Sequence, residues 1–400
     1  MIRILFLYLG PGIGGPVFSL IQLLENLNNV RIKAYVLVLP NTNQESLLRI
    51  SNIPGVELIH MKIWINNWLF STNSGERLSF IKSLKANFRF FRAFYNSILI
   101  SRIILKYKIN LVHSNIELFS EGALAAFISG RKHVWHIRAV IGNNGVVNHK
   151  LGERFLLKTI SFFSSAIIAN SKATLEPLKR RIPEKKLNLV YNGISPERFE
   201  NPKSDSGLRH QYSISGSTII VGGIGYVSRL KGALEFVEVA KDVINSFNNV
   251  VFLYIGPAHD GGDRVTMQFC DNFLKDNSLE KRVIYTGYRN DIEKIISEID
   301  IFFQPMKNGS WSRVVMEAMA AGKPVVAFEE SKTSELIDNT STGLIGCNIT
   351  ECADCIARLI NDDRLRFRLG SKAKDHVFRH FSNETAARKI ENIYSNLQNI

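Results

Sequence analysis

The chain has 400 residues, of which 45% are hydrophobic and 22% charged, and its formal net charge is +14. This length suits two globular domains of about 200 residues, each able to bury its own core. No run of 18 apolar residues occurs, so a membrane-spanning helix is not expected. The positive charge suits nucleic acid, anionic lipid or phosphorylated small molecules, but no compact nucleic-acid-binding motif stands out.

The cysteines and the first residues indicate the cytoplasm. Four cysteines do not suggest a disulfide framework. The pair Cys352-x-x-Cys355 could bind metal or do redox chemistry, but it has no second pair and lies in a helical pattern, which favours core or surface thiols. Residues 1–9 are too short for a signal peptide and are better explained as a buried strand.

Strands and helices alternate through the N-terminal half. Strands are predicted at 2–9, 32–40, 56–62, 109–114, 134–137 and 166–169, and helices at 17–28 and 123–129. Alternation of this kind predicts a parallel sheet with helices on both faces. In such a sheet ligands bind at the carboxyl ends of the strands.

The C-terminal half repeats the pattern. Strands are predicted at 219–224, 250–255, 283–286, 299–303 and 325–327, with a helix at 232–246 and a last helix at 383–399. A polar stretch rich in Pro, Gly and Ser separates the halves. The sequence therefore predicts an N-terminal α/β domain over 1–195, a linker over 196–217, a C-terminal α/β domain over 218–382, and a final helical segment over 383–400 that could cross back to the N-terminal domain.

A glycine-rich loop follows the first strand. Gly10, Gly12 and Gly15 satisfy the G-x-G-x-x-G pattern of dinucleotide sites. The second strand, however, ends in Leu39-Pro40 without the acidic residue that holds a ribose, and Pro11 removes one amide donor. A nicotinamide or flavin site, a loop lining a phosphate or acceptor pocket, and a plain tight turn remain as interpretations.

Basic and histidine side chains occur at other strand ends. Arg229 and Lys231 lie between the first strand of the second half and its helix, where the helix dipole favours phosphate; a solvated basic turn is the alternative. His136 and Arg138 end a strand of the first half, and each could equally be an ordinary, satisfied residue.

One carboxylate stands in an otherwise apolar helix. In the segment 300–337 a buried strand, a polar loop, a helix and a second strand follow one another, and Glu317 is the acid of that helix. A buried carboxylate is costly unless it is hydrogen-bonded, so Glu317 is expected to face a polar group.

These segments together resemble the retaining glycosyltransferases built from two Rossmann-like domains, the GT-B fold, of the group 1 and family 4 kind. The resemblance lies in the run from Glu317 to Ala327, EAMAAGKPVVA, in Lys231-Gly232 and in the paired Gly14-Gly15. It implies transfer of a sugar, with retention, from a nucleotide diphosphate to an acceptor hydroxyl. No cofactor beyond the nucleotide-sugar substrate is implied, and because no D-x-D occurs a metal is not expected.

The resemblance also assigns roles to residues. His136 and Glu317 form its catalytic set, with Glu317 on the ribose hydroxyls. Its donor site comprises Gly225, Arg229, Lys231, Gly287, Tyr288, Arg289, Gly309, Arg313 and Glu317. Its acceptor-side loop comprises Gly12, Gly14, Gly15 and Arg138.

Two positions depart from the family pattern. Gly309 stands where the family has the first glutamate of its E-x7-E pair, and Ser331-Lys332 replace a glycine pair. Two alternatives to the transferase therefore stay open: a non-catalytic relative that binds a glycan or a partner, and an NAD-dependent oxidoreductase.

A helix with a basic stripe is predicted over 80–95. Ile81, Leu84, Phe88, Phe91 and Tyr95 share one face, and Lys82, Lys85, Arg89 and Arg92 form a second stripe roughly 100° round the helix. Core packing with a solvated basic face, docking onto an anionic membrane and nucleic-acid binding all explain the pattern, the last least well. Docking would make the protein peripheral on the inner face of the membrane, and it indicates a lipid-linked or cell-envelope glycan as the acceptor.

Overall fold

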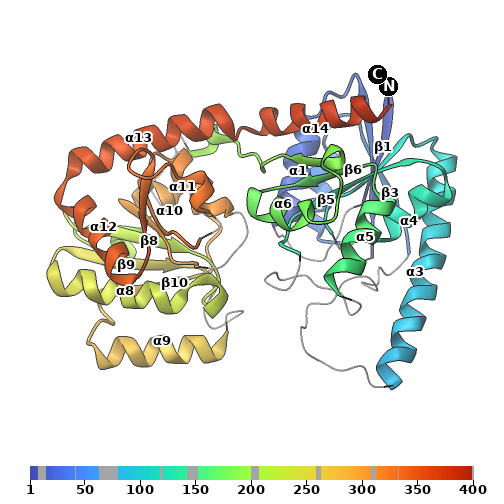
Figure 1. The fold of residues 1–400 in the computed structure, drawn as a ribbon. Coiled ribbons are helices and arrows are strands. Elements are labelled where there is room, and N and C mark those ends of the chain that lie inside the picture. The colour runs from blue at the N-terminus through green and yellow to red at the C-terminus, as the bar shows by residue number, and fades with distance from the viewer. Residues whose placement is uncertain are drawn as a thin grey trace. The chain divides into compact units, whose positions relative to one another are not determined.

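The structure is a computed structural model that describes residues 1–7, 15–40, 42–62, 80–117, 120–141, 152–199, 207–257, 263–307, 312–331 and 333–398, with residues 80–90, 196 and 334 described by their backbone alone. The chain forms two compact units. Unit 1 comprises Met1–Gly193 and Asn383–Ile400, and unit 2 comprises Ile194–Ser382 (Figure 1).

Unit 1 is built on a parallel sheet. In the described residues it has seven strands in the order β3-β2-β1-β4-β5-β6-β7. The strands are β1 Ile2–Leu7, β2 Ile32–Val38, β3 Val56–His60, β4 Leu111–Ser114, β5 Lys132–Ile137, β6 Ala166–Ala169 and β7 Leu187–Leu189. The helices are α1 Gly15–Asn26, α2 Gln44–Ser51, α3 Phe80–Lys106, α4 Ser120–Ile128, α5 Glu153–Phe163, α6 Lys172–Lys179 and α14 Asn383–Gln398, with the 3-10 turn η1 at Glu184–Lys186.

Unit 2 repeats this architecture. Its described sheet has six parallel strands in the order β10-β9-β8-β11-β12-β13. The strands are β8 Ile219–Ile224, β9 Val250–Ile255, β10 Val283–Gly287, β11 Ile301–Gln304, β12 Val325–Phe328 and β13 Gly343–Gly346. The helices are α7 Leu208–Gln211, α8 Ala233–Ser246, α9 Arg264–Asp276, α10 Ile292–Glu298, α11 Arg313–Ala320, α12 Ile349–Asn361 and α13 Asp363–His380, with 3-10 turns η2 Pro196–Phe199, η3 Arg229–Lys231 and η4 Ser334–Leu336.

Both sheets confirm the predicted Rossmann-like α/β class. In each, the strand order reverses beside the first strand of the unit, between β1 and β4 in unit 1 and between β8 and β11 in unit 2. The carboxyl ends of these strands form the crevice in which such sheets bind ligands. The Arg229–Lys231 turn follows β8, so this predicted motif lies at such a point, whereas residues 10–14 of the glycine-rich loop lie outside the described residues.

The core of unit 1 lies on both faces of its sheet. Ile4 and Phe6 of β1 pack in one cluster with α1 and α14, whereas Leu5 and Leu7 pack in another with α3 and α4. Successive strand residues point to opposite faces, which explains why β1 is apolar throughout. The last helix is part of this core, because Tyr394 of α14 is fully buried.

Helix α3 turns a different face inward from the one that its aromatic spacing predicts. Phe91 is 69% exposed and Tyr95 60% exposed. The buried residues in the described part of this helix are Ala93, Asn96, Ser97, Ile100, Ser101 and Ile104. Of the interpretations of this stripe, core packing is therefore wrong for Phe91 and Tyr95. Helix α3 packs on the alanine-rich helix α4, and small side chains allow that close approach.

The other members of the two α3 stripes, Ile81, Lys82, Leu84, Lys85, Phe88 and Arg89, have side chains outside the described part of the structure. No helix in the described residues is both long enough and apolar enough to span a bilayer.

Candidate functional site

The loop after β8 is tightly built around glycines. Gly232 has φ +77°, and a Cβ there would lie 2.2 Å from the carbonyl oxygen of Pro305. Gly256, with φ +145°, would place a Cβ 2.0 Å from the carbonyl oxygen of Gly225. Only glycine fits these two positions, so the loops after β8, β9 and β11 approach one another at the backbone.

Lys231 and Arg229 belong to this loop. Both side chains are exposed, and they belong to the turn η3 directly before α8. The Cβ and Cγ of Lys231 lie 3.6 Å from where a Cβ of Gly225 would be, so the lysine stem passes over Gly225. Surrounding protein atoms desolvate the ammonium and lower the pKa of Lys231. Two cations at a helix N-terminus can receive a phosphate.

Glu317 is paired within its own helix. Only 8% of the residue is exposed, and its Oε1 accepts a hydrogen bond from Nε of Arg313 at 2.8 Å, one helical turn earlier. Burial raises the pKa of Glu317, and the nearby Arg313 offsets part of that rise. The expectation that this carboxylate faces a polar group is met by Arg313, and the i, i+4 spacing of the two residues was the signal in the sequence.

The guanidinium of Arg289, which is predicted to bind a ligand, donates hydrogen bonds to other residues of the protein. Its Nε and Nη2 donate to the two carboxylate oxygens of Asp291 at 2.9 and 2.8 Å, and its Nη1 donates to Gln211 at 2.8 Å. Beside it Tyr288 is 75% exposed, and Gly287 has φ +74° with open space where a Cβ would be. A role for Arg289 at a nucleobase stays a prediction, and it requires these bonds to coexist with the ligand or to be exchanged.

Six of the positions singled out from the sequence lie outside the described residues: Gly10, Pro11, Gly12, Gly14, Gly309 and Lys332. Gly15 is the first residue of α1, with open space around it. Ser331 is buried, and its hydroxyl contacts that of Thr333.

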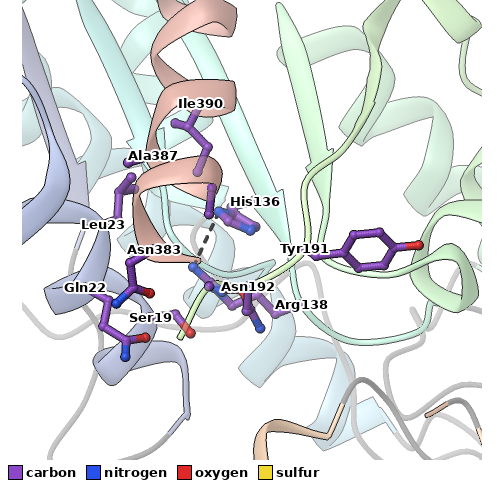
Figure 2. A pocket seen from close by; sticks show the side chains of 12 residues that line it. Ser19, Gln22, Leu23, His136, Arg138, Tyr191, Asn192, Asn383, Ala387 and Ile390 are labelled. Carbon is purple, nitrogen blue, oxygen red and sulfur yellow. Dashed lines mark hydrogen bonds between the residues drawn. The ribbon is translucent and has the colours of Figure 1, made fainter. Parts of the chain in front are cut away.

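A small pocket in unit 1 brings His136 and Arg138 together (Figure 2). Its volume is about 20 Å³, room for about one water molecule. It is lined from α1 by Ser19, Gln22 and Leu23, from the end of β5 by His136 and Arg138, from the segment Tyr191, Asn192 and Gly193, and from α14 by Asn383, Ala386, Ala387 and Ile390. Gly193 permits this closure, since a Cβ there would lie 2.6 Å from Cα of Asn383.

Arg138, which lines the pocket, binds surrounding residues through hydrogen bonds. Its Nε and Nη2 donate to the carbonyl and side-chain oxygens of Asn115 at 2.7 and 2.8 Å, and its Nη1 donates to Oδ1 of Asn192 at 2.7 Å. Its backbone N–H donates to Glu117 at 3.0 Å. Burial lowers the pKa of Arg138 to about 10, which leaves it charged at neutral pH. No local pattern in the sequence indicates Asn115 or Glu117 as its partners.

His136 lines this pocket, and its tautomer follows from its contact with Arg138. Its Nδ1 lies 3.4 Å from Nη2 of Arg138, and a guanidinium can only donate, so we assign Nδ1 as the acceptor and place the proton on Nε2. Within the described residues Nε2 is buried and has no partner. Burial, followed by the charge of Arg138, holds the pKa of His136 well below its usual value, so the imidazole is neutral.

Comparisons with known proteins cover most of the chain. Residues 14–198 match the model "Glycosyltransferase Family 4", and residues 218–362 match "Glycosyl transferases group 1". N-acetyl-alpha-D-glucosaminyl L-malate synthase of Bacillus anthracis is 26% identical over 53% of this chain and 54% of its own length. The chain thus spans about half of that relative.

Two further comparisons span more of the chain. The UDP-Gal:alpha-D-GlcNAc-diphosphoundecaprenol alpha-1,3-galactosyltransferase of Escherichia coli is 22% identical over 80% of this chain and 83% of its own length. The crystal structure of HepE of Anabaena in complex with UDP superposes with a TM-score of 0.78 at 22% identity, over 99% of this chain and 100% of the other. At that identity the superposition establishes the fold alone.

Proposed function

Because this chain belongs to the group 1 and family 4 glycosyltransferases of the GT-B fold, we propose that it transfers a sugar, with retention, from a nucleoside diphosphate to a hydroxyl of a glycan acceptor. The observation that carries the proposal is the buried pair of Glu317 and Arg313. It lies in the segment matched to the group 1 transferases and in the helix that follows β11, at the carboxyl edge of the unit 2 sheet.

Unit 2 is the donor side in this proposal. Glu317 accepts hydrogen bonds from the ribose hydroxyls, and Arg313 keeps the buried carboxylate ionised for that purpose. Lys231 and Arg229, with the N-terminus of α8, bind the diphosphate. The loop from Gly287 to Arg289 lies beside the base.

The chemical step needs stabilisation of the leaving group. The bond between the anomeric carbon and the diphosphate oxygen breaks, the acceptor oxygen bonds to that carbon, and the acceptor proton passes to the diphosphate or to water. Charge develops on the diphosphate, where the two cations stabilise it without a metal ion. On the unit 1 side, the neutral His136 is assigned to the reacting sugar, and this role requires its buried Nε2 to become accessible, because the pocket beside it holds about one water molecule.

The acceptor is a lipid-linked or cell-envelope glycan in this proposal. The relative in Escherichia coli is named for a diphosphoundecaprenol acceptor. The α3 stripe of Lys82, Lys85, Arg89 and Arg92 would hold the protein on the inner face of an anionic membrane, and the exposure of Phe91, Phe94 and Tyr95 on that helix supports such a contact.

A donor screen tests the proposal. Calorimetry with UDP and GDP sugars should reveal at least one that binds, and Lys231→Gln should weaken its binding. The matched control is Lys281→Gln, since Lys281 is also exposed but precedes β10 and so lies at the opposite edge of the sheet. Release of nucleoside diphosphate should then depend on an added glycan acceptor. If no nucleotide sugar binds, the proposed function is wrong.

A non-catalytic glycan- or partner-binding relative is the second candidate. Gly309, in place of the family's first glutamate, favours it. A nucleotide sugar that binds but releases no nucleoside diphosphate with any glycan acceptor would support this candidate over the transferase.

A further inference from the structure

An aromatic surface that the sequence did not reveal lies across α4 and α5, which pack together in unit 1 (Figure 1). At the end of α4, Phe127 is 59% exposed and Ile128 42% exposed. On α5, Phe155 is 39% exposed and Phe162 67% exposed. The rings of Phe127 and Phe162 lie 5.7 Å apart, so the two helices contribute to one patch.

The exposed rings are not displaced core residues. The inward face of α5 is complete, because Leu156, Leu157 and Ile160 are buried in the cluster beneath it. Phe155, Lys158 and Phe162 follow one another at spacings of three and four residues, so they share the outer face. A surface this apolar indicates contact with something other than water.

Four exposed cations lie in or directly beside the segments that carry the aromatic patch. Arg131, Lys132, Arg154 and Lys158 are all exposed, and none makes an ion pair with another described residue. The segments 127–132 and 154–163 contain no acidic residue. The nearest acid in sequence, Glu153, is directed to Arg180, whose Nη1 lies 3.6 Å from its carboxylate.

We propose that this surface of α4 and α5 docks onto anionic membrane lipid, with the phenyl rings at the acyl boundary and the cations at the headgroups. A second copy of the chain fits poorly, because a symmetric contact would bring the same four cations together. Single-stranded nucleic acid also fits poorly, because its bases stack on ring faces. Phe163 packs edge-to-face against both Phe127 and Phe162, at 89° to each, so these rings are already engaged with one another.

The inference adds a second face to the membrane contact of α3, and it does not rest on transferase activity, since vesicle binding is measured without substrates. The purified chain should sediment with vesicles of phosphatidylglycerol and phosphatidylcholine at low salt, and not with phosphatidylcholine alone. Raised salt should release it.

The decisive variant combines Arg154→Gln, Lys158→Gln and Phe162→Ser. Each cation near an anionic surface contributes a factor of about five, so the loss of two should weaken vesicle binding about 25-fold, and the lost ring should weaken it further. The matched control is Arg264→Gln, Phe269→Ser and Lys275→Gln on α9, three exposed residues of unit 2 whose loss changes the net charge equally.

A second variant from the other helix, Phe127→Ser with Arg131→Gln, keeps the test valid if the first fails to fold. Equal vesicle binding by the patch variants and the control would overturn the proposal. It would also be overturned if the chain self-associates in sedimentation and only the patch variants stay monomeric, or if an oligothymidylate binds the patch and anionic vesicles do not.

Discussion

The phenol oxygen of Tyr394 lies 2.6 Å from Nδ1 of His113, across 281 positions of sequence. Tyr394 belongs to α14 and His113 to β4, and both side chains are fully buried. A buried hydrogen bond thus joins the last helix to the sheet of unit 1, in addition to apolar packing. The bond lies beside His136, whose ring centroid is 5.5 Å from that of His113.

Tyr394→Phe should therefore destabilise unit 1. The variant leaves Nδ1 of His113 buried without its partner, which should lower the free energy of unfolding by about 1–3 kcal/mol. Urea unfolding can be followed through Trp135 in a background in which the other tryptophans, Trp64, Trp68 and Trp311, are phenylalanine. Tyr95→Phe is the control, because that ring is 60% exposed and its loss should change the free energy by less than about 0.5 kcal/mol. Equal effects of the two changes would mean that the Tyr394 bond contributes nothing.

Three buried histidines should make unit 1 sensitive to acid. Burial lowers the pKa of His133 to about 3 and holds the pKa values of His113 and His136 well below their usual range. Below the unfolded-state histidine pKa of about 6.5, the unfolded chain binds protons at these histidines and the folded chain does not. The free energy of unfolding is therefore unaffected by these groups above that pH, and it falls as the pH drops towards their folded-state pKa values.

The expected slope is about 1.4 kcal/mol per pH unit for each of these histidines. His133→Asn should remove one such contribution, and the slope between pH 6 and pH 5 should become shallower by about that amount when measured by urea unfolding through Trp135. His60→Asn is the control, because His60 is exposed. An unchanged slope in His133→Asn would contradict the neutral, buried state of that side chain.

Glu317→Ala should weaken nucleotide-sugar binding by about 1–3 kcal/mol, since the ribose hydroxyls would lose a charged acceptor. Calorimetry measures this change, and Glu280→Ala, which removes an exposed carboxylate of unit 2, should leave affinity unchanged. Unaltered affinity in the Glu317 variant would remove this residue from the donor site.

Transferase activity should survive EDTA, because Lys231 and Arg229 are assigned to the leaving diphosphate in place of a metal ion. The measurement is turnover before and after chelation, followed by addition of magnesium or manganese. Activity that vanishes with EDTA and returns with either metal would contradict that assignment.

The positions of individual strands and helices could be predicted, because each depends on a pattern within a short stretch of sequence. Strand β6 occupies Ala166–Ala169 and α14 begins at Asn383, both as predicted, because apolar runs and helix-starting residues are read within a few positions. The pairing of Glu317 with Arg313 could also have been predicted, since residues four apart are neighbours on a helix.

Contacts between distant segments were not predictable in this way. Nothing near His113 in the sequence points to Tyr394, and nothing near Arg138 points to Asn115 or Asn192. The inward face of α3 was also missed, because it depends on the alanines of α4 and not on the periodicity of α3 itself. The clustering of Phe127 with Phe162 likewise arises only when α4 and α5 come together.

The assignment of α14 to unit 1 has a consequence for the order of synthesis. A ribosome completes all of unit 2 before it makes the helix whose Ala387, Ile390 and Tyr394 fill the core beside β1 and α1. Until then the nascent unit 1 exposes that apolar face, although its whole sheet has already emerged. The final folding step of the first unit must therefore await the last helix, and the exposed face is where a chaperone would bind during translation.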